Sequence, residues 1–74
     1  MDEYGKVYMK LEELIQKKGI SKTQLSYRSK INHTQINRFC RGDAVRIDFN
    51  TIARLCCVLD CKVSDLIIYE PPKG

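Results

Sequence analysis

The polar side chains between residues 33 and 41 combine hydrogen-bonding and cationic groups, and none of them is a carboxylate. At helical spacing, one face of this segment carries four polar residues: Thr34, Asn37, Arg38 and Arg41. The opposite face carries three apolar residues: Ile36, Phe39 and Cys40. A solvated helix face usually mixes charges of both signs. Amides, a hydroxyl and two guanidiniums are instead the groups that hydrogen-bond to base edges and bind phosphates.

Other residues that could do chemistry are few. The single histidine, His33, has no partner spaced for a catalytic triad or a metal site. Glu12 and Glu13 are adjacent, so on a helix they point about 100 degrees apart and indicate solvated surface rather than an acid and base pair. The four glycines are isolated, which excludes a phosphate-binding glycine loop. We therefore expect no enzyme activity, no catalytic residue and no cofactor.

The four cysteines follow the spacing C-x15-C-C-x3-C, at Cys40, Cys56, Cys57 and Cys61. This spacing matches no paired C-x2-C metal motif, so we expect no metal site. The main interpretation is reduced thiols that act as small core residues. A redox sensor that uses Cys56, Cys57 or Cys61 stays open as an alternative.

Two helix-start signals lie eleven residues apart and position the polar face. Ser21 precedes Gln24 by three residues, and Asn32 precedes Gln35 by three. A short polar side chain at such a position can cap the first turn of a helix while the Gln reaches back to the cap. The sequence thus predicts one helix over about 22–29 and a second over about 33–41, which ends at Gly42.

Apolar periodicity predicts three further helices. The first runs from about Val7 to Lys18, although Tyr8 and Met9 leave a short extended entry open. A fourth helix follows the cap residue Asp48 after a loop over 43–47 and ends near Asp60, and a fifth spans about 63–67. Residues 68–70 look extended. We expect an all-α fold, a compact bundle of five short helices over residues 7–70, with a flexible leader over 1–6 and a flexible tail over 71–74.

The positive charge is concentrated in the middle of the chain. The 74 residues carry a net charge of +4. Residues 19–46 hold six basic groups and one acidic group, whereas residues 1–18 are neutral and residues 47–74 are net negative by one. Such a concentration is typical of phosphate binding. There is neither an apolar run long enough for a membrane span nor a signal peptide, so we expect a cytoplasmic protein.

The stretch from Ser21 to Gly42 resembles the helix-turn-helix of the Cro/C1-type, or lambda-repressor-like, DNA-binding family. The resemblance extends from about Leu11 to Ile67 and rests on six positions: Leu25, Ser26, Ile31, Asn32, Ile36 and Gly42. One position departs from the family, which usually has Gly in the turn where this chain has Lys30. A lysine forced into the left-handed conformation there costs about 1–2 kcal/mol.

The resemblance implies a partner, double-stranded DNA, and a set of contact residues. In the family's docking geometry, the second helix of the motif enters the major groove. Its expected base-facing residues are His33, Thr34, Asn37 and Arg38, with Gln35 at the margin. Lys22 matches the position, at the start of the motif's first helix, that contacts the DNA backbone in the family. Arg41 and Arg46 are placed to contact the DNA backbone on the other side.

We expect a small repressor that binds a short, roughly palindromic operator as a homodimer, at least on DNA. Residues 66–69 form an apolar segment that is either the dimer contact or packed on the first helix of its own chain. No small-molecule ligand is evident. The alternative function is an antitoxin-like or other protein-interaction module with secondary DNA binding, whose partner would contact the fourth and fifth helices.

Overall fold

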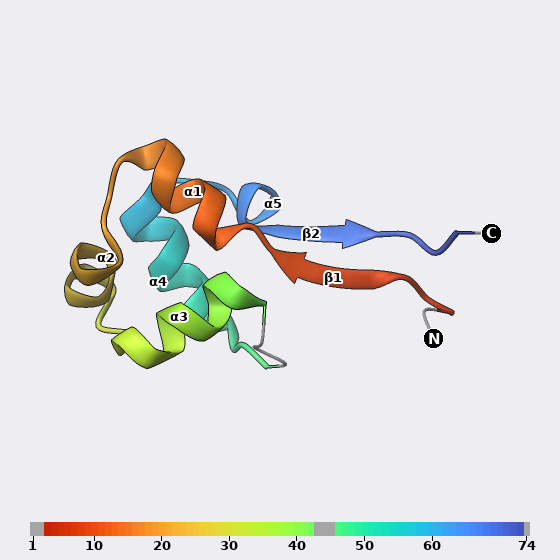
Figure 1. Cartoon of the computed structure of the whole chain (residues 1–74), viewed down its shortest axis with the longest axis horizontal. Coiled ribbons are helices and arrows are strands. Elements are labelled where there is room, and N and C mark those ends of the chain that lie inside the picture. Colours follow the sequence, from red (N-terminus) through yellow and green to blue (C-terminus); the bar gives the residue numbers. More distant parts are fainter. Residues whose placement is uncertain (1–2, 43–45, 74) are drawn as a thin grey trace.

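The computed structural model describes residues 3–42 and 46–73. Over these ranges the chain forms five helices and two strands, in the order β1 (Lys6–Met9), α1 (Leu11–Lys18), α2 (Lys22–Ser29), α3 (His33–Arg41), α4 (Phe49–Leu59), α5 (Val63–Leu66) and β2 (Ile67–Glu70). The helices gather at one end of the molecule, and the two strands extend from them as a ribbon (Figure 1). The predicted five-helix bundle is confirmed, and a small two-stranded sheet is added to it.

The ribbon ties the N-terminal segment to the C-terminal segment. β1 pairs with β2 in antiparallel register, with Lys6 opposite Glu70 and Met9 opposite Ile67. Lys6 Nζ lies 3.6 Å from Glu70 Oε1. The ladder continues into the bundle, where the Lys10 N–H donates to the carbonyl of Leu66 over 2.8 Å. The entry to α1 and the end of α5 are therefore held together.

The prediction that the first helix begins at about Val7 is wrong, because residues 6–9 form β1 and α1 begins at Leu11. The expected helical stripe included Val7, but that side chain is 64% exposed. Only the later members of the stripe, from Leu11 onward, face the core. Residues 6–9 alternate between the two faces of a strand, and their partner strand lies about 60 residues away in sequence, so local periodicity cannot reveal the pairing.

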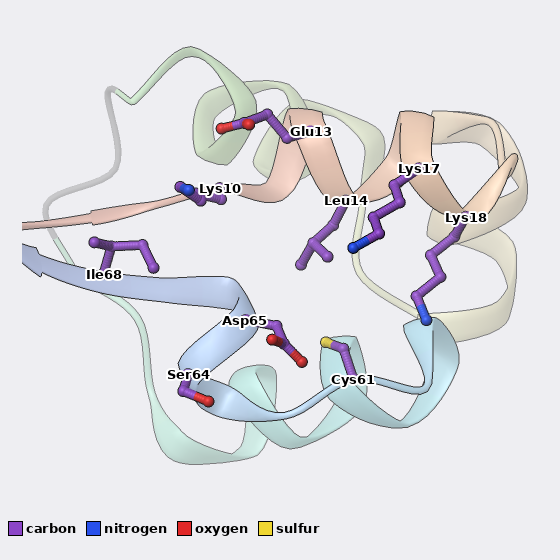
Figure 2. A pocket seen from close by; sticks show the side chains of 9 residues that line it. All are labelled: Lys10, Glu13, Leu14, Lys17, Lys18, Cys61, Ser64, Asp65 and Ile68. Carbon is purple, nitrogen blue, oxygen red and sulfur yellow. The ribbon is translucent and has the colours of Figure 1, made fainter.

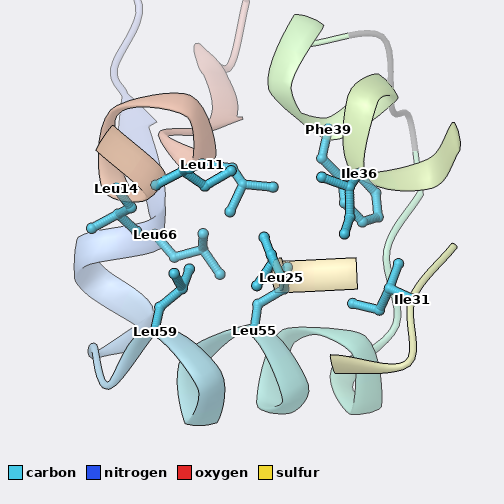
Figure 3. Packing of buried hydrophobic residues seen from close by; sticks show 10 residues of the cluster. Leu11, Leu14, Leu25, Ile31, Ile36, Phe39, Leu55, Leu59 and Leu66 are labelled. Carbon is cyan, nitrogen blue, oxygen red and sulfur yellow. The ribbon is translucent and has the colours of Figure 1, made fainter. Parts of the chain in front are cut away.

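Every helix contributes to a single apolar core (Figure 3). Its buried members are Leu11, Leu14, Ile15, Leu25, Ile31, Ile36, Phe39, Leu55, Leu59 and Leu66. From α3, Ile36 and Phe39 are 0% and 2% exposed. Burial of such a side chain contributes roughly 1.5–3 kcal/mol. The core therefore fixes the rotation of α3 about its own axis and turns its polar face outward.

Three helices start at the cap residues that the sequence predicts. The Ser21 hydroxyl accepts from the Gln24 N–H over 3.0 Å, and the Ser21 N–H donates to Gln24 Oε1 over 3.2 Å, which completes a capping box. Asn32 Oδ1 accepts from the Gln35 N–H over 2.8 Å. Asp48 Oδ1 accepts from the N–H of residue 51 over 2.8 Å. These bonds satisfy amides that a helix leaves unpaired at its start.

The turn between α2 and α3 places Lys30 in the left-handed region, with φ 64° and ψ 24°. Two serine hydroxyls brace this turn. Ser26 Oγ donates to the Ile31 carbonyl over 2.6 Å, and Ser29 Oγ donates to the Leu25 carbonyl over 2.6 Å while it accepts from the Ile31 N–H over 3.3 Å. The strained position of Lys30 is thus held by bonds on both of its sides.

The remaining boundaries differ little from expectation. α4 ends at Leu59 and α5 ends at Leu66, one residue earlier than predicted, because Ile67 joins β2. Of the expected loop over 43–47, residues 43–45 lie outside the described residues, and residues 46 and 47 have no regular structure. Within the described ranges, no helix is both long enough and apolar enough to cross a membrane.

Candidate nucleic-acid interface

The outward face of α3 carries the side chains that the sequence singled out. Five of them are exposed: His33, Thr34, Gln35, Arg38 and Arg41. Asn37 is half-buried, and Ile36 and Phe39 are buried on the opposite side. The amphipathic character predicted for this helix is therefore confirmed. A surface rich in amide and guanidinium groups faces solvent, and a rigid helix holds its groups at fixed spacing.

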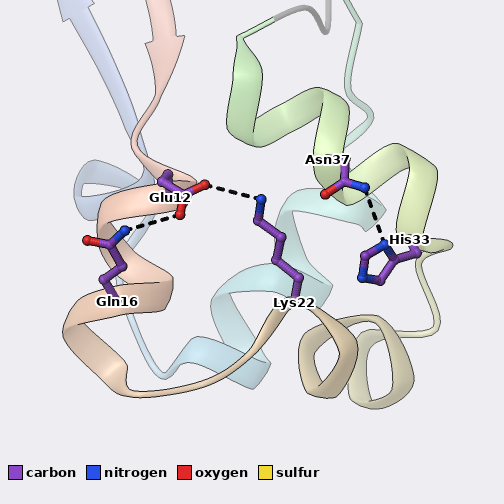
Figure 4. A network of polar contacts seen from close by, with 5 residues as sticks. All are labelled: Glu12, Gln16, Lys22, His33 and Asn37. Atoms are coloured by element: carbon purple, nitrogen blue, oxygen red, sulfur yellow. Dashed lines mark hydrogen bonds and ion pairs between the residues drawn. The ribbon is translucent and has the colours of Figure 1, made fainter.

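His33 and Asn37 contact each other across one turn of α3. Asn37 Nδ2 lies 3.3 Å from His33 Nδ1 (Figure 4). When Nδ1 of the neutral imidazole accepts this bond, its proton is on Nε2, which points away as a donor. Asn37 keeps its Oδ1 and its second N–H for another partner. The pair thus presents a donor from the ring and both a donor and an acceptor from the amide.

Lys22, at the start of α2, lies against α1 rather than alone at the surface. Its Nζ is 3.4 Å from Glu12 Oε1, and the side chains of Lys22 and Glu12 are 36% and 45% exposed. The other carboxylate oxygen, Oε2, accepts from Gln16 Nε2 over 3.2 Å. The sequence indicated Glu12 as solvated surface, and it missed this contact because the two residues are on different helices.

Arg46 and Gln35 are brought together at the start of α4. With Ile47, Asp48 and Thr51 they line a surface hollow of about 710 Å³. Thr34, Arg38 and Arg41 lie along α3 itself. The eight predicted contact residues therefore fall into the α3 face, the Gln35 and Arg46 hollow beside it, and Lys22 with its carboxylate partner.

The cysteines are free thiols in partly covered positions, except that Cys57 is exposed. Burial raises the pKa of Cys61 to about 11, and the neighbouring thiol of Cys56 adds to the rise. Burial also raises the pKa of Cys40. A raised pKa keeps a thiol protonated and weakly reactive. Across residues 3–42 and 46–73, no group of three or more His, Cys, Asp or Glu side chains could hold a metal ion.

The apolar segment over 66–69 is only partly open. Leu66 is fully buried in the core of its own chain, whereas Tyr69 is 59% exposed and its hydroxyl donates to the Tyr4 carbonyl over 2.8 Å. Packing within one chain therefore accounts for the apolar side chain of Leu66 but not for that of Tyr69. Tyr69 shares the outer part of the ribbon with Val7, its partner in register.

A cavity of about 290 Å³ lies between α1 and α5 (Figure 2). Its charged lining mixes three lysines with two carboxylates: Lys10, Lys17, Lys18, Glu13 and Asp65. Lys18 Nζ already donates to the Asp60 carbonyl over 3.3 Å. Charges of both signs therefore line the wall of this cavity.

Comparison with known proteins identifies a family for this chain. The family model of the Cro/C1-type helix-turn-helix DNA-binding domain matches residues 10–72. No protein with curated annotation is significantly similar to the chain in sequence.

Two solved structures share the fold. One is a protein from Bacteroides fragilis described as a candidate DNA-binding protein, with a TM-score of 0.77 at 13% identity over 85% of this chain and 100% of that one. Another is SinR, the master regulator for biofilm formation, in complex with DNA, with a TM-score of 0.67 at 17% identity over 72% of this chain and 84% of that one. The family match spans most of the sequence, and the chain belongs to the Cro/C1-type helix-turn-helix DNA-binding domain family.

Proposed function

We propose that this chain is a sequence-specific transcriptional regulator that reads duplex DNA with α3 in the major groove. The observation that carries the proposal is the orientation of α3. Burial of Ile36 and Phe39 leaves a face of amide, hydroxyl, imidazole and guanidinium groups in solvent, without a carboxylate of its own. A helix of this width fits the major groove, where such groups distinguish the four base pairs.

The base-reading roles are divided among the α3 side chains. Arg38 pairs with guanine through O6 and N7, because a guanidinium offers two parallel donors at that spacing. Asn37 reads adenine with its amide, which the bond to His33 holds in one orientation. His33 and Thr34 meet neighbouring base edges, and Gln35 meets a base or a phosphate at the margin of the groove.

The remaining cations bind the DNA backbone. Lys22 meets one phosphate beside the N-terminus of α2, where backbone amides and the helix dipole favour an anion. Arg46 lies next to Gln35 and the start of α4, so it meets a phosphate on the other side of α3. Arg41, in the last turn of α3, meets a phosphate on the same DNA strand as Arg46. These contacts set the register on the duplex and carry no sequence information.

The regulator binds its operator as a symmetric dimer and represses by occluding the promoter. One α3 spans only a few base pairs, so a useful specificity ratio needs two copies on two half-sites about 34 Å apart. Exposed apolar side chains on the ribbon, Val7 and Tyr69, support contact between copies.

Selection of bound sequences from random duplex DNA tests this function. At about 0.1–0.15 M salt, weak phosphate attraction no longer dominates binding. We expect a palindromic motif with half-sites one helical turn apart, and loss of one base preference in the Arg38→Ala variant. Equal binding of every duplex would refute sequence reading, and a motif without symmetry would refute the dimer.

A further inference from the structure

Glu12 occupies the place beside Lys22 that the proposed function gives to a phosphate. Its Oε1 is 3.4 Å from Lys22 Nζ, and its Oε2 is held by Gln16 Nε2 at 3.2 Å (Figure 4). Gln16 lies one turn further along α1, so the carboxylate is supported from its own helix. Both oxygens have partners, and the acidic group is oriented toward the start of α2.

The Glu12 and Lys22 pair also borders α3. Burial is the main cause of the raised pKa of the Cys40 thiol. The carboxylate of Glu12 raises that pKa further, and the ammonium of Lys22 lowers it. Cys40 belongs to the last turn of α3, so both charges lie within electrostatic reach of the helix that reads DNA. Neither α2 nor α3 contains a carboxylate. Glu12 is thus an acid that the fold brings from α1 to the edge of a basic surface.

We propose that Glu12 is an internal competitor of the DNA backbone: it holds Lys22 in the free chain and lowers the affinity for every duplex alike. The inference rests on the proposed phosphate contact of Lys22. Carboxylate and phosphate oxygens bind the same ammonium, so DNA must take Lys22 from Glu12 and then lie close to a repelling charge. Glu12 thereby sets the level of non-specific binding and leaves the choice among sequences to α3.

The test compares Glu12→Gln with Glu13→Gln, a closely matched control. Both residues lie in the first turn of α1, so each substitution removes one negative charge and the same favourable interaction with the helix dipole. Glu13 is exposed and its side chain lines the α1 and α5 cavity instead. The readout is the fluorescence anisotropy of a labelled random-sequence duplex at about 0.05 M and 0.15 M salt.

Glu12→Gln should tighten binding about two- to fivefold at the lower salt, the range expected for an exposed ion pair, and by less at the higher salt. Glu13→Gln should change the affinity for the duplex by a smaller factor than Glu12→Gln. In a Lys22→Ala background the gain from Glu12→Gln should shrink, because the contested ammonium is gone. Circular dichroism melting curves of all variants check that they fold.

Equal effects of the two glutamine substitutions, or weaker binding by Glu12→Gln, would overturn the inference. The outcome for Lys22→Ala separates this from the proposed function. If Lys22→Ala weakens binding and flattens its salt dependence by about one unit of slope, the phosphate contact stands whatever Glu12 does. If Lys22→Ala has no effect, the phosphate role of Lys22 and the competition by Glu12 fall together.

Discussion

Replacement of Lys30 by glycine should stabilise the fold, because Lys30 closes α2 in the left-handed region at φ 64° and ψ 24°. A side chain with a Cβ atom is disfavoured there, and glycine is not. Lys30 is exposed, so the substitution removes no core packing. Its N–H donates to the Ser26 carbonyl over 3.0 Å, a backbone bond that glycine retains.

The magnitude follows from two opposing effects at Lys30. Relief of the left-handed conformation is worth about 1–2 kcal/mol. Against it, a glycine gives the unfolded chain more freedom, which costs about 0.5–1 kcal/mol. The net gain in the free energy of unfolding should be about 0.5–1 kcal/mol. For a domain of this size that corresponds to a rise in Tm of about 2–8 °C.

Urea unfolding followed by far-UV circular dichroism measures this gain, with Lys30→Ala as the control. Alanine loses the same charge and the same long side chain but keeps the Cβ atom, so its stability should stay close to that of the original chain. The slope against urea should not change, because neither variant alters the surface exposed on unfolding. Equal stability of the glycine and alanine variants would mean that relief of the left-handed conformation only matches the entropic cost of glycine, and it would refute the predicted net gain.

Three other predictions concern the reading face, the turn and the thiols. Arg38→Ala should weaken binding to the selected operator by about 1–3 kcal/mol and relax the preference for one base. Arg28→Ala, an equal loss of charge on α2, should do neither, and equal losses of affinity in the two variants would contradict base reading by Arg38. Ser29→Ala should lower the free energy of unfolding by about 1–3 kcal/mol, since the 2% exposed hydroxyl holds two backbone groups of the turn; an unchanged urea midpoint would contradict this. Burial raises the pKa of Cys61 from 9.0 to about 11, so the neutral thiol stabilises the fold below about pH 9 and the stabilisation is lost as pH rises toward 11. Over that pH range, the urea midpoint should fall less steeply in Cys61→Ala than in the original chain. An equally steep fall in both would contradict the role of the Cys61 thiol.

Much of the proposed DNA-reading surface could be predicted from sequence because its organising signals are local. The caps at Ser21 and Asn32 act on residues three positions away, and helical periodicity separates Ile36 and Phe39 from the polar face. Such interactions are complete within one turn of helix. The bounds of α2 and α3 were therefore predicted to the residue, and the left-handed conformation considered for Lys30 is the one found.

The contacts around the site could be predicted only in part. The bond between His33 and Asn37 spans one helical turn and could have been found from their spacing. The ion pair of Lys22 with Glu12 and the hollow shared by Gln35 and Arg46 could not, because each joins residues from different elements. Their geometry depends on how the helices cross.

By itself the sequence determined where the four helices after α1 start, which faces are apolar, and where positive charge gathers, since each of these depends on neighbours within a few residues. Only the tertiary structure decided that residues 6–9 are a strand and that Glu12 meets Lys22. A strand needs a partner, and Ile67–Glu70 becomes that partner for β1 only after the core has brought the two ends of the described chain together. The same closure of the core sets α1 beside the start of α2, where a carboxylate and an ammonium ten residues apart can meet.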